Sequence, residues 1–375
     1  MRIVTVLNSL GVGGAEKQAL GVAERMVNRG HEVRLLVLMP RLAEEWATAL
    51  PVVHLDIRKT PASVAAGFRH GRRFLGEFRP DVVHSHSFQA NLLARWLGIG
   101  ARTVLFSTVH NVYEGGWMRM LAYRLTDGLS ERTVAVSQAA AERFVRLRAI
   151  PKRKCLVRTN GIDTAEFTPD AGRRAATREV MGAGNSFVWL SAGRITPAKD
   201  FPNLLRAFQL VRNEVPDPEL WIAGAPMDAK TVISADGVPH HFSVMAGEKG
   251  TQQHVRWLGL RRDMPALLDA ADGFVLGSAW EGMPLVVGEA MAMEKPVVAT
   301  DVGGVRELLG DAGTLVPARD PEALARAMLA TMRQSREERV QLRRAARERI
   351  VGHFSLDASA DWWEALYKQG VASRE

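Results

Sequence analysis

Short apolar runs alternate with longer amphipathic stretches along the first half of the chain. The apolar runs span four to seven residues and predict buried strands, whereas the amphipathic stretches repeat with helical spacing. Strands are predicted at 2–7, 32–38, 52–55, 81–84, 103–108 and 133–136, and helices at 15–28, 62–77, 89–96, 117–127 and 138–147. Regular strand–helix alternation is typical of a parallel sheet with helices on both faces, so we predict a doubly wound α/β domain.

The same alternation resumes after residue 168 and predicts a second α/β domain. Strands are predicted at 187–192, 219–223, 255–258, 273–276 and 296–299, and helices at 171–181, 201–211 and 265–270. A chain of 375 residues exceeds what one core usually holds, about 250–300 residues. The turn at Asn160–Gly161 and the break at Pro169 separate the two patterns. We expect domains at 1–168 and 169–355, with a last helix in 356–375.

Composition narrows the class of protein. Hydrophobic residues make up 47% of the chain and charged residues 24%, as is usual for a globular protein in water. A single cysteine, Cys155, excludes an internal disulfide and a cysteine-based metal cluster. The first apolar run is too short for a secretory signal, and none reaches the roughly 18 residues of a membrane span. These features favour a cytoplasmic enzyme.

The net charge of +8 is concentrated in the first half. Residues 1–168 hold 24 lysines and arginines against 14 acidic residues, a net of +10, and the remainder hold 25 against 27, a net of −2. A basic half favours an anionic partner such as a phospholipid surface, a lipid pyrophosphate or a nucleic acid. The densest charged stretch, 336–349, mixes both signs without interleaved aromatic residues, which argues against nucleic acid.

Two glutamates frame a predicted strand-to-helix turn, GSAWEGMPLVVGE at 277–289. Pro284 favours a first helical turn, so a helix is expected to begin near Met283. Glu281 then lies in the preceding loop and Glu289 in the second turn. Backbone amides and the helix dipole at such a start favour a phosphate, while the carboxylates can accept ribose and sugar hydroxyls. An ordinary crossover with two solvated glutamates would show the same spacing.

Two further loops follow predicted strands. In GRITPAKDF at 193–201, Gly193 permits a tight turn, and Arg194 and Lys199 form a candidate diphosphate clamp or, alternatively, two surface cations. In the turn at 8–14, glycines allow a ligand to approach the backbone at a helix start. A dinucleotide fingerprint would need a glycine where Glu16 stands, so a dehydrogenase is disfavoured.

Several stretches together resemble retaining glycosyltransferases of the two-Rossmann-domain (GT-B) type, family 4. The resemblance rests on GVGGAEKQ at 11–18, STVH at 107–110, NGIDTAEF at 160–167, GRITPAKDF at 193–201 and GSAWEGMPLVVGEAMA at 277–292. It covers nearly the whole chain in the right order. It implies two Rossmann-like domains facing a cleft, with the last helix crossing back to pack on the first domain.

The resemblance also implies roles for individual residues. His110 would reach the transferred sugar, and Arg194 and Lys199 would neutralise the departing diphosphate. Glu281 would orient the sugar hydroxyls. The further nucleotide-sugar contacts expected are Gly13, Gly14, Gly193, Leu258, Arg262, Gly282, Met283, Pro284, Leu285, Val286 and Glu289. Neither a metal ion nor a cofactor other than the substrate nucleotide-sugar is expected.

The implied activity moves a hexose or N-acetylhexosamine from a nucleotide-sugar, UDP-linked by family frequency, to a glycan or lipid-linked acceptor in envelope polysaccharide or lipopolysaccharide synthesis. Asp200 replaces a glycine usual in the family, and GAPMDAK at 224–230 replaces a Gly-x-Gly turn. The irregular stretch 226–254 is therefore a candidate for setting substrate choice. A nucleotide-sugar epimerase and a non-catalytic nucleotide-sugar-binding module remain alternatives. The sequence fixes neither the donor sugar, the acceptor and linkage, nor the oligomeric state.

Two histidines and two helical segments are further candidates for contact with a ligand or a membrane. His84 and His86 follow the fourth strand and are either ligand groups or structural, and no third ligand is evident for a metal. Segment 62–78 places Arg69, Arg72 and Arg73 beside apolar residues, which fits an anionic membrane surface or a solvated basic face. Segment 117–123, WMRMLAY, fits contact with a lipid-linked acceptor or with the core.

Overall fold

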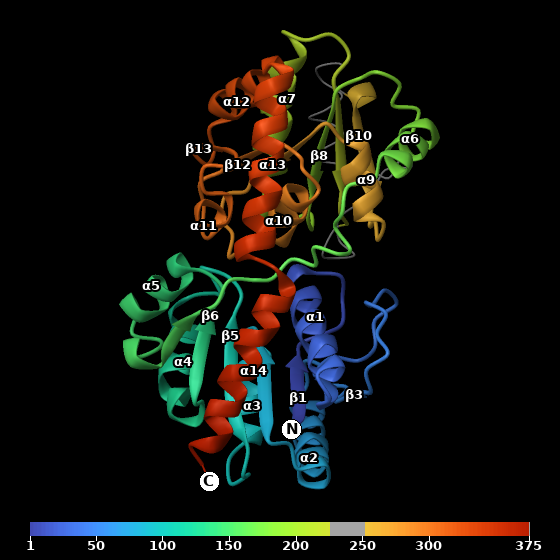
Figure 1. Ribbon diagram of the computed structural model, residues 1–375. Coiled ribbons are helices and arrows are strands. Elements are labelled where there is room, and N and C mark those ends of the chain that lie inside the picture. Colours follow the sequence, from blue (N-terminus) through green and yellow to red (C-terminus); the bar gives the residue numbers. More distant parts are fainter. Residues whose placement is uncertain (226–251, 375) are drawn as a thin grey trace. The chain divides into compact units, whose positions relative to one another are not determined.

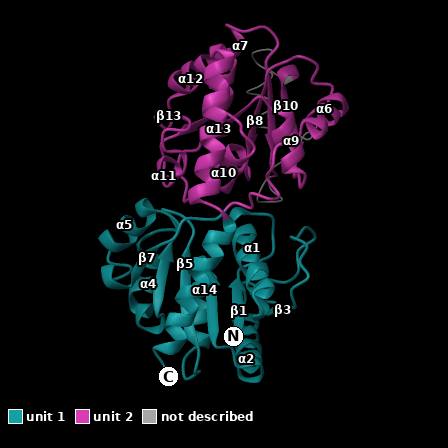
Figure 2. Ribbon diagram, in the orientation of Figure 1, with its two compact units in different colours: residues 1–161, 356–375 teal, residues 162–355 magenta. Residues whose placement is uncertain are grey.

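The computed structural model describes residues 1–225 and 252–374 (Figure 1). The chain divides into two compact units, residues 1–161 with 356–375, and residues 162–355 (Figure 2). The sequence pattern placed the boundary at 168, and residues 162–168 belong to the second unit. Of the irregular stretch 226–254, all but residues 252–254 lie outside the described part of the chain.

Unit 1 contains a parallel seven-stranded sheet in the order β3-β2-β1-β4-β5-β6-β7. The strands are β1 (Arg2–Leu7), β2 (Glu32–Val37), β3 (Val52–His54), β4 (Val82–His86), β5 (Val104–Val109), β6 (Arg132–Ala135) and β7 (Cys155–Val157). The helices are α1 (Gly14–Asn28), α2 (Pro61–Phe78), α3 (Phe88–Leu97), α4 (Trp117–Thr126), α5 (Gln138–Arg146) and α14 (Leu356–Ala372), with short 3-10 turns at Asp127–Leu129 and Lys152–Lys154. The strand order reverses between β1 and β4, where open α/β sheets bind ligands.

The core of unit 1 explains why its strands are apolar throughout. Helices α1 and α14 pack on one face of the sheet, and α2 and α3 pack on the other (Figure 1). Helix α14 contributes Leu356, Ala360, Trp363 and Tyr367 to this core. A side chain at Gly21 of α1 would lie 2.7 Å from Leu356, so this glycine permits the close approach of the two helices. The last helix is thus an integral part of unit 1.

Unit 2 contains a parallel six-stranded sheet in the order β10-β9-β8-β11-β12-β13. The strands are β8 (Val188–Ala192), β9 (Glu219–Ala223), β10 (Val255–Gly259), β11 (Gly273–Leu276), β12 (Val297–Thr300) and β13 (Thr314–Val316). The helices are α6 (Ala171–Val180), α7 (Phe201–Arg212), α9 (Met264–Ala270), α10 (Leu285–Ala292), α11 (Val305–Leu309), α12 (Pro321–Arg333) and α13 (Arg336–His353), with 3-10 turns at Pro197–Lys199 and Gln252–His254. Helices α7 and α12 share one hydrophobic cluster with the sheet.

The predicted fold class, two Rossmann-like α/β domains, is confirmed. One detail is wrong: α10 begins at Leu285, not near Met283. Pro284 is extended, with φ −75° and ψ 113°, and precedes the helix as its N-cap instead of forming the first turn. Glu289 still lies in the second turn, and Glu281 still lies in the loop before the helix.

Candidate functional site

The carboxyl ends of β8 and β11 bring two of the expected loops together in unit 2. The backbone N–H of Ala279 donates to the carbonyl oxygen of Ala198 at 2.8 Å and ties the loops to each other. Across this tie, Lys199 Nζ lies 2.6 Å from Glu281 Oε1. Ser278 Oγ donates to the same carboxylate oxygen at 2.7 Å. Lys199 and Glu281, 82 residues apart in sequence, therefore form one charged site.

Glycines give Lys199 its position. A Cβ at Gly193 would lie 2.6 Å from Lys199 Cε, so the lysine side chain lies directly over this backbone. A Cβ at Gly224 would overlap the carbonyl oxygen of Gly193. The β8 and β9 ends can approach this closely only because both positions lack a side chain.

Another glycine supports Glu281. Gly303 has a φ of +55°, and a Cβ there would overlap the carbonyl oxygen of Glu281. The next residue, Gly304, donates its N–H to the carbonyl oxygen of Gly282 at 2.7 Å. Thr300 at the end of β12 donates to the carbonyl oxygen of Ser278 at 2.7 Å. Three consecutive strand ends therefore fix the loop that carries Glu281.

The N-terminus of α10 lies directly after this loop. Gly282, Met283, Pro284 and Leu285 are buried, and Val286 is half-buried. Within the described residues no side chain caps this end of α10, and a helix start carries the positive end of the dipole. Glu289 is 4% exposed. The sequence therefore places a buried carboxylate one turn into a helix that can bind an anion at its start.

Other expected contacts lie near the remaining strand ends of unit 2. Arg194 is exposed and forms no ion pair within residues 1–225 and 252–374. Leu258 lies at an irregularity in the pairing of β10 with β9, and Gly259, with φ +63°, accepts from the N–H of Gly224 at 2.7 Å. Arg262 is exposed. Arg194 and Arg262 are thus cations open to solvent, unlike Lys199.

In unit 1 the glycine-rich turn leads into α1. Gly13 is the extended N-cap, with φ −159°, and Gly14 is the first helical residue. Gly13 accepts the N–H of Lys17 at 3.0 Å. One turn further on, Gln18 Oε1 accepts the N–H of Gly161 at 2.9 Å. This hydrogen bond anchors the end of segment 1–161 to α1.

Three of the histidines of unit 1, His84, His86 and His110, form a column of adjoining rings. His84 bonds Tyr367 Oη through Nδ1 at 2.6 Å and Thr108 Oγ1 through Nε2 at 2.7 Å. The rings of His84 and His86 are 4.0 Å apart between centroids, and His86 Nδ1 lies 3.0 Å from His110 Nε2. Burial lowers the pKa of His84 to about 3 and that of His110 to about 4, and also lowers the pKa of His86 well below its usual value. All three rings are therefore neutral near pH 7.

Glu114 holds the loop after β5. Its Oε1 accepts the backbone N–H of His110 at 3.0 Å, and its Oε2 accepts from Tyr123 Oη at 2.7 Å. Asn91 Nδ2 donates to the same tyrosine oxygen at 3.0 Å. Burial raises the pKa of Glu114 to about 7, although these hydrogen bonds oppose the shift. Glu114 was not among the site residues predicted from the sequence.

The predicted membrane-facing helices differ in what they expose. On α2, Arg72 donates to the carbonyl oxygens of Leu97 at 2.8 Å and Ile99 at 2.5 Å, and Arg73 pairs with Glu77 at 3.8 Å. Arg69 lines a surface hollow at the start of α2. Helix α4 buries Met120 and Tyr123 but exposes an apolar face, defined here as Trp117, Met118, Leu121 and Leu125.

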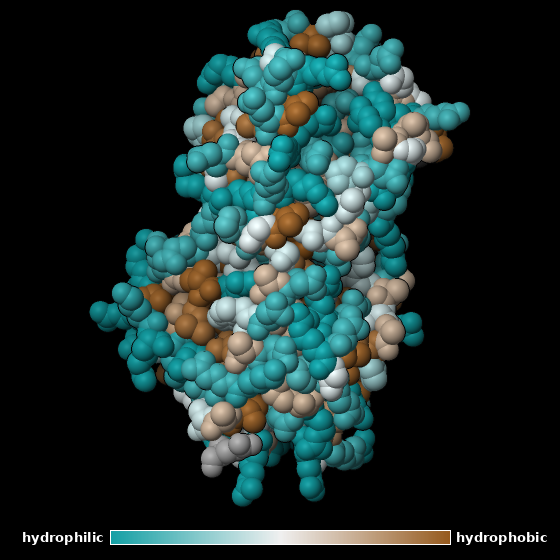
Figure 3. Space-filling view, viewed as in Figure 1, coloured by the Kyte–Doolittle hydropathy of each residue, from teal (hydrophilic) through white to brown (hydrophobic). Residues whose placement is uncertain are grey.

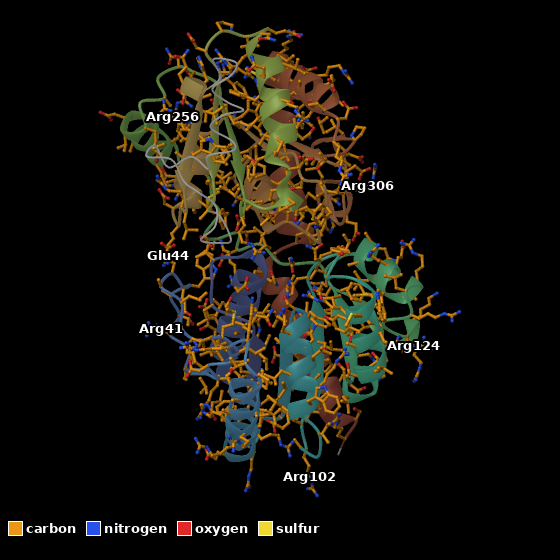
Figure 4. The ribbon with its side chains drawn as sticks, turned by 180° about the vertical axis from the view of Figure 1, so that it is seen from behind. Arg41, Glu44, Arg102, Arg124, Arg256 and Arg306 are labelled. Carbon is orange, nitrogen blue, oxygen red and sulfur yellow. The ribbon has the colours of Figure 1, made fainter. Side chains whose placement is uncertain are left out.

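Apolar residues gather on the part of unit 1 that carries α4 and α5 (Figure 3). Arg124 of α4 extends outward from unit 1 (Figure 4). No helix in the described part of the chain is both long and apolar enough to cross a membrane.

Within residues 1–225 and 252–374, no group of three or more histidines, cysteines and carboxylates is arranged to hold a metal ion.

Comparison with known proteins identifies the family. The model of the family described as Glycosyltransferase Family 4 matches residues 12–166. The model of the family described as Glycosyl transferases group 1 matches residues 186–334. A D-inositol 3-phosphate glycosyltransferase of Jonesia denitrificans is 30% identical over 95% of this chain and 91% of its own length. The chain belongs to the family 4 glycosyltransferases.

Two further similarities are to a second relative and to a solved structure. The UDP-Gal:alpha-D-GlcNAc-diphosphoundecaprenol alpha-1,3-galactosyltransferase of Escherichia coli is 24% identical over 80% of this chain and 79% of its own length. The crystal structure of Anabaena Alr3699/HepE in complex with UDP and glucose has a TM-score of 0.85 at 20% identity, covering 98% of this chain and all of that one. The glycosyltransferase therefore has the GT-B fold.

The structure of the glycosyltransferase groups its expected site residues by unit. In unit 2, Lys199, Glu281, Gly193 and the start of α10 lie around adjacent strand ends. In unit 1, His110 lies at the end of β5, with Gly13 and Gly14 at the start of α1. Ser278 and the support from Gly303 were not predicted from the sequence. The glycine pair 303–304 indicates a close backbone approach, but its partner follows only from the pairing of β12 with β11.

Proposed function

We propose that this glycosyltransferase moves a hexose or N-acetylhexosamine from a UDP-sugar to a glycan or lipid-linked acceptor, with retention of anomeric configuration and without a metal ion. The observation that carries the proposal is the Lys199–Glu281 pair at the joined ends of β8 and β11. It unites a cation for phosphate oxygens with a carboxylate for sugar hydroxyls. A surface ion pair would lack this support from Ser278 and Gly303.

The chemistry follows from where charge develops. As the bond between the sugar and the diphosphate breaks, negative charge grows on the outer phosphate of the nucleoside diphosphate. Lys199, Arg194 and the amides at the start of α10 would stabilise that charge, because they are in place before the reaction. Glu281 would bind sugar hydroxyls and Glu289 the ribose. The leaving phosphate oxygen would take the proton of the acceptor hydroxyl.

The named relatives support the donor and acceptor classes. The Escherichia coli relative is named for a UDP-sugar donor and a diphosphoundecaprenol-linked acceptor, and the Anabaena structure contains UDP and glucose. A lipid-linked acceptor also suits unit 1, which combines the exposed apolar face of α4 with a basic composition. We therefore place the acceptor side of the reaction, and contact with an anionic membrane surface, on unit 1.

The test is a transfer assay with a panel of UDP-, GDP- and ADP-sugars and a polyprenyl-diphosphate sugar acceptor. We expect turnover with a UDP-sugar, an axial product linkage from an axial donor by NMR, and no loss of rate with EDTA. Lys199→Ala and Glu281→Ala should each lower turnover at least about tenfold while staying folded. The exposed Lys152→Ala is the matched control and should not change it.

Other outcomes would reject specific parts of the proposal. Conversion of the donor into an epimer without acceptor would indicate an epimerase. Donor binding without transfer or hydrolysis under any condition would indicate a binding module. Inversion at the anomeric carbon would reject retention, and loss of activity with EDTA that Mg²⁺ restores would reject metal independence.

A further inference from the structure

The ring nitrogens of His110 have different surroundings. Nε2 lies 3.0 Å from Nδ1 of His86. Nδ1 is shielded from solvent and has no hydrogen-bond partner among the described residues. His110 therefore has one ring nitrogen engaged within the protein and one left for a ligand.

We propose that His86 holds His110 as the Nε2–H tautomer, so that Nδ1 of His110 accepts a hydrogen bond from a hydroxyl of a sugar substrate. The inference rests on the proposed function, because it requires a sugar within reach of His110. It assigns His86 as a positioning residue that acts through His110.

The hydrogen bond itself limits the possible tautomers. A neutral imidazole has one donor and one acceptor nitrogen, and burial lowers the pKa of both rings, so neither is charged near neutral pH. Hence one of the two facing nitrogens donates and the other accepts. If His86 is the donor, His110 carries its proton on Nδ1. If His110 is the donor, its proton is on Nε2 and its Nδ1 has a free lone pair.

The surroundings of Nδ1 favour the second arrangement. A buried N–H without a partner is rarer in proteins than an acceptor without one, because its desolvation is not offset. The Nε2–H tautomer leaves only a lone pair at the unpartnered position. A sugar hydroxyl can donate to that lone pair, so the tautomer suits both the free and the substrate-bound protein.

The rest of the column makes the arrangement rigid. His86 lies in β4, 3% exposed, and its ring packs against that of His84 at a tilt of 42°. His84 is in turn fixed by Tyr367 and by the ring of Trp363, 4.0 Å away between centroids. The backbone of His110 is held by Glu114. Both rings therefore keep their relative positions, and the proton has a defined place.

Substitutions at residue 86 separate the hydrogen bond from packing. In His86→Asn a side-chain oxygen can replace Nδ1, whereas His86→Gln carries its amide one bond further out and His86→Leu has none. We expect His86→Asn to keep turnover within about threefold, and His86→Gln and His86→Leu to lose about tenfold or more. UDP affinity should not change in any of them. His31→Leu, which removes another partly buried histidine of unit 1, is the control for general destabilisation.

Nitrogen-15 NMR of histidine-labelled protein tests the tautomer without any activity. Two-bond correlations show which ring nitrogen carries the proton, and loss of the signal in His110→Asn assigns the residue. We expect Nε2–H for His110 in the wild type and a mixture of tautomers in His86→Leu. A Nδ1–H form in the wild type, an unchanged His110 in His86→Leu, or full turnover in His86→Leu would overturn the proposal. Absence of transfer with every donor would instead reject the proposed function, and the NMR result would stand on its own.

Discussion

Lys199 shows how single residues create the charged site. A lysine ammonium has three N–H donors, and Glu281 engages one of them. Two donors remain for oxygen atoms of a diphosphate, so the ion pair and the ligand do not compete for the same group. The side chain is 17% exposed and lies over Gly193, so little of its freedom is lost when a ligand binds.

Gly193→Ala should displace Lys199 without removing its charge. The new methyl group would lie 2.6 Å from Lys199 Cε, and the lysine would have to leave Glu281. We expect transfer to fall about tenfold or more, as for Lys199→Ala. The control is Gly182→Ala, because Gly182 also has a positive φ, +59°, but no neighbour within 4 Å. Equal activity losses in both variants would show that backbone strain alone is responsible.

Glu114 should give the folding stability a defined pH dependence. Its folded pKa, about 7, lies above its usual value of 4.5, so the folded state holds a proton that the unfolded state has lost between these pH values. The contribution is complete below about pH 4.5 and is lost as pH rises through 7. Glu114→Gln keeps a similar shape without the proton. The difference in unfolding free energy, wild type minus variant, should therefore fall from pH 4.5 to 7, and a flat difference would contradict this origin.

At the scale of elements, periodicity predicted most strands and helices but not all of their edges. The runs CLV in β7 and TLV in β13 are three residues long, too short to alternate, and were not predicted. A proline predicts the first helical position, but here Pro284 is extended and precedes the helix, which explains the shift of α10. These ambiguities are local, and only the packing of the neighbouring elements resolves them.

Contacts between elements need the sheet register, which the sequence pattern does not contain. His86 lies opposite Thr108 in the pairing of β4 with β5, and His110 follows two residues later. This register brings His86 and His110 together. Likewise, Gly303 meets Glu281 only because β12 lies beside β11. The loops of the site were therefore predictable one by one, but their partners were not.

Helix α14 should depend on its bond to β4. Tyr367 is 1% exposed and bonds His84 Nδ1 at 2.6 Å, so Tyr367→Phe leaves a buried ring nitrogen without a partner. We expect a loss of about 1–3 kcal/mol in unfolding free energy, measured by denaturant titration. Tyr113→Phe, at a tyrosine that is 50% exposed, is the matched control and should change stability little. An equally small effect of Tyr367→Phe would mean that the hydrogen bond adds no net stability.

At the scale of the whole molecule, charge and apolar exposure coincide in unit 1. Residues 1–161 and 356–375 hold 26 lysines and arginines against 16 acidic residues, a net of +10, although the whole chain carries +8. The same unit carries the exposed apolar face of α4. Acidic lipids attract basic surfaces, and large apolar side chains anchor them at the interface. The two features together favour a membrane surface over a soluble anion.

Vesicle binding should therefore depend on both charge and α4. We expect the protein to sediment with vesicles of phosphatidylglycerol and phosphatidylcholine but not with phosphatidylcholine alone, and binding to weaken as salt screens the charges. Trp117→Ser and Leu125→Ser should each weaken binding about tenfold, since burying one large apolar side chain contributes about 1.5–3 kcal/mol. Val180→Ser in unit 2, at a side chain 85% exposed, is the control. If both α4 variants bind as the wild type does, α4 does not enter the membrane. If binding is independent of lipid charge, the basic unit does not drive it.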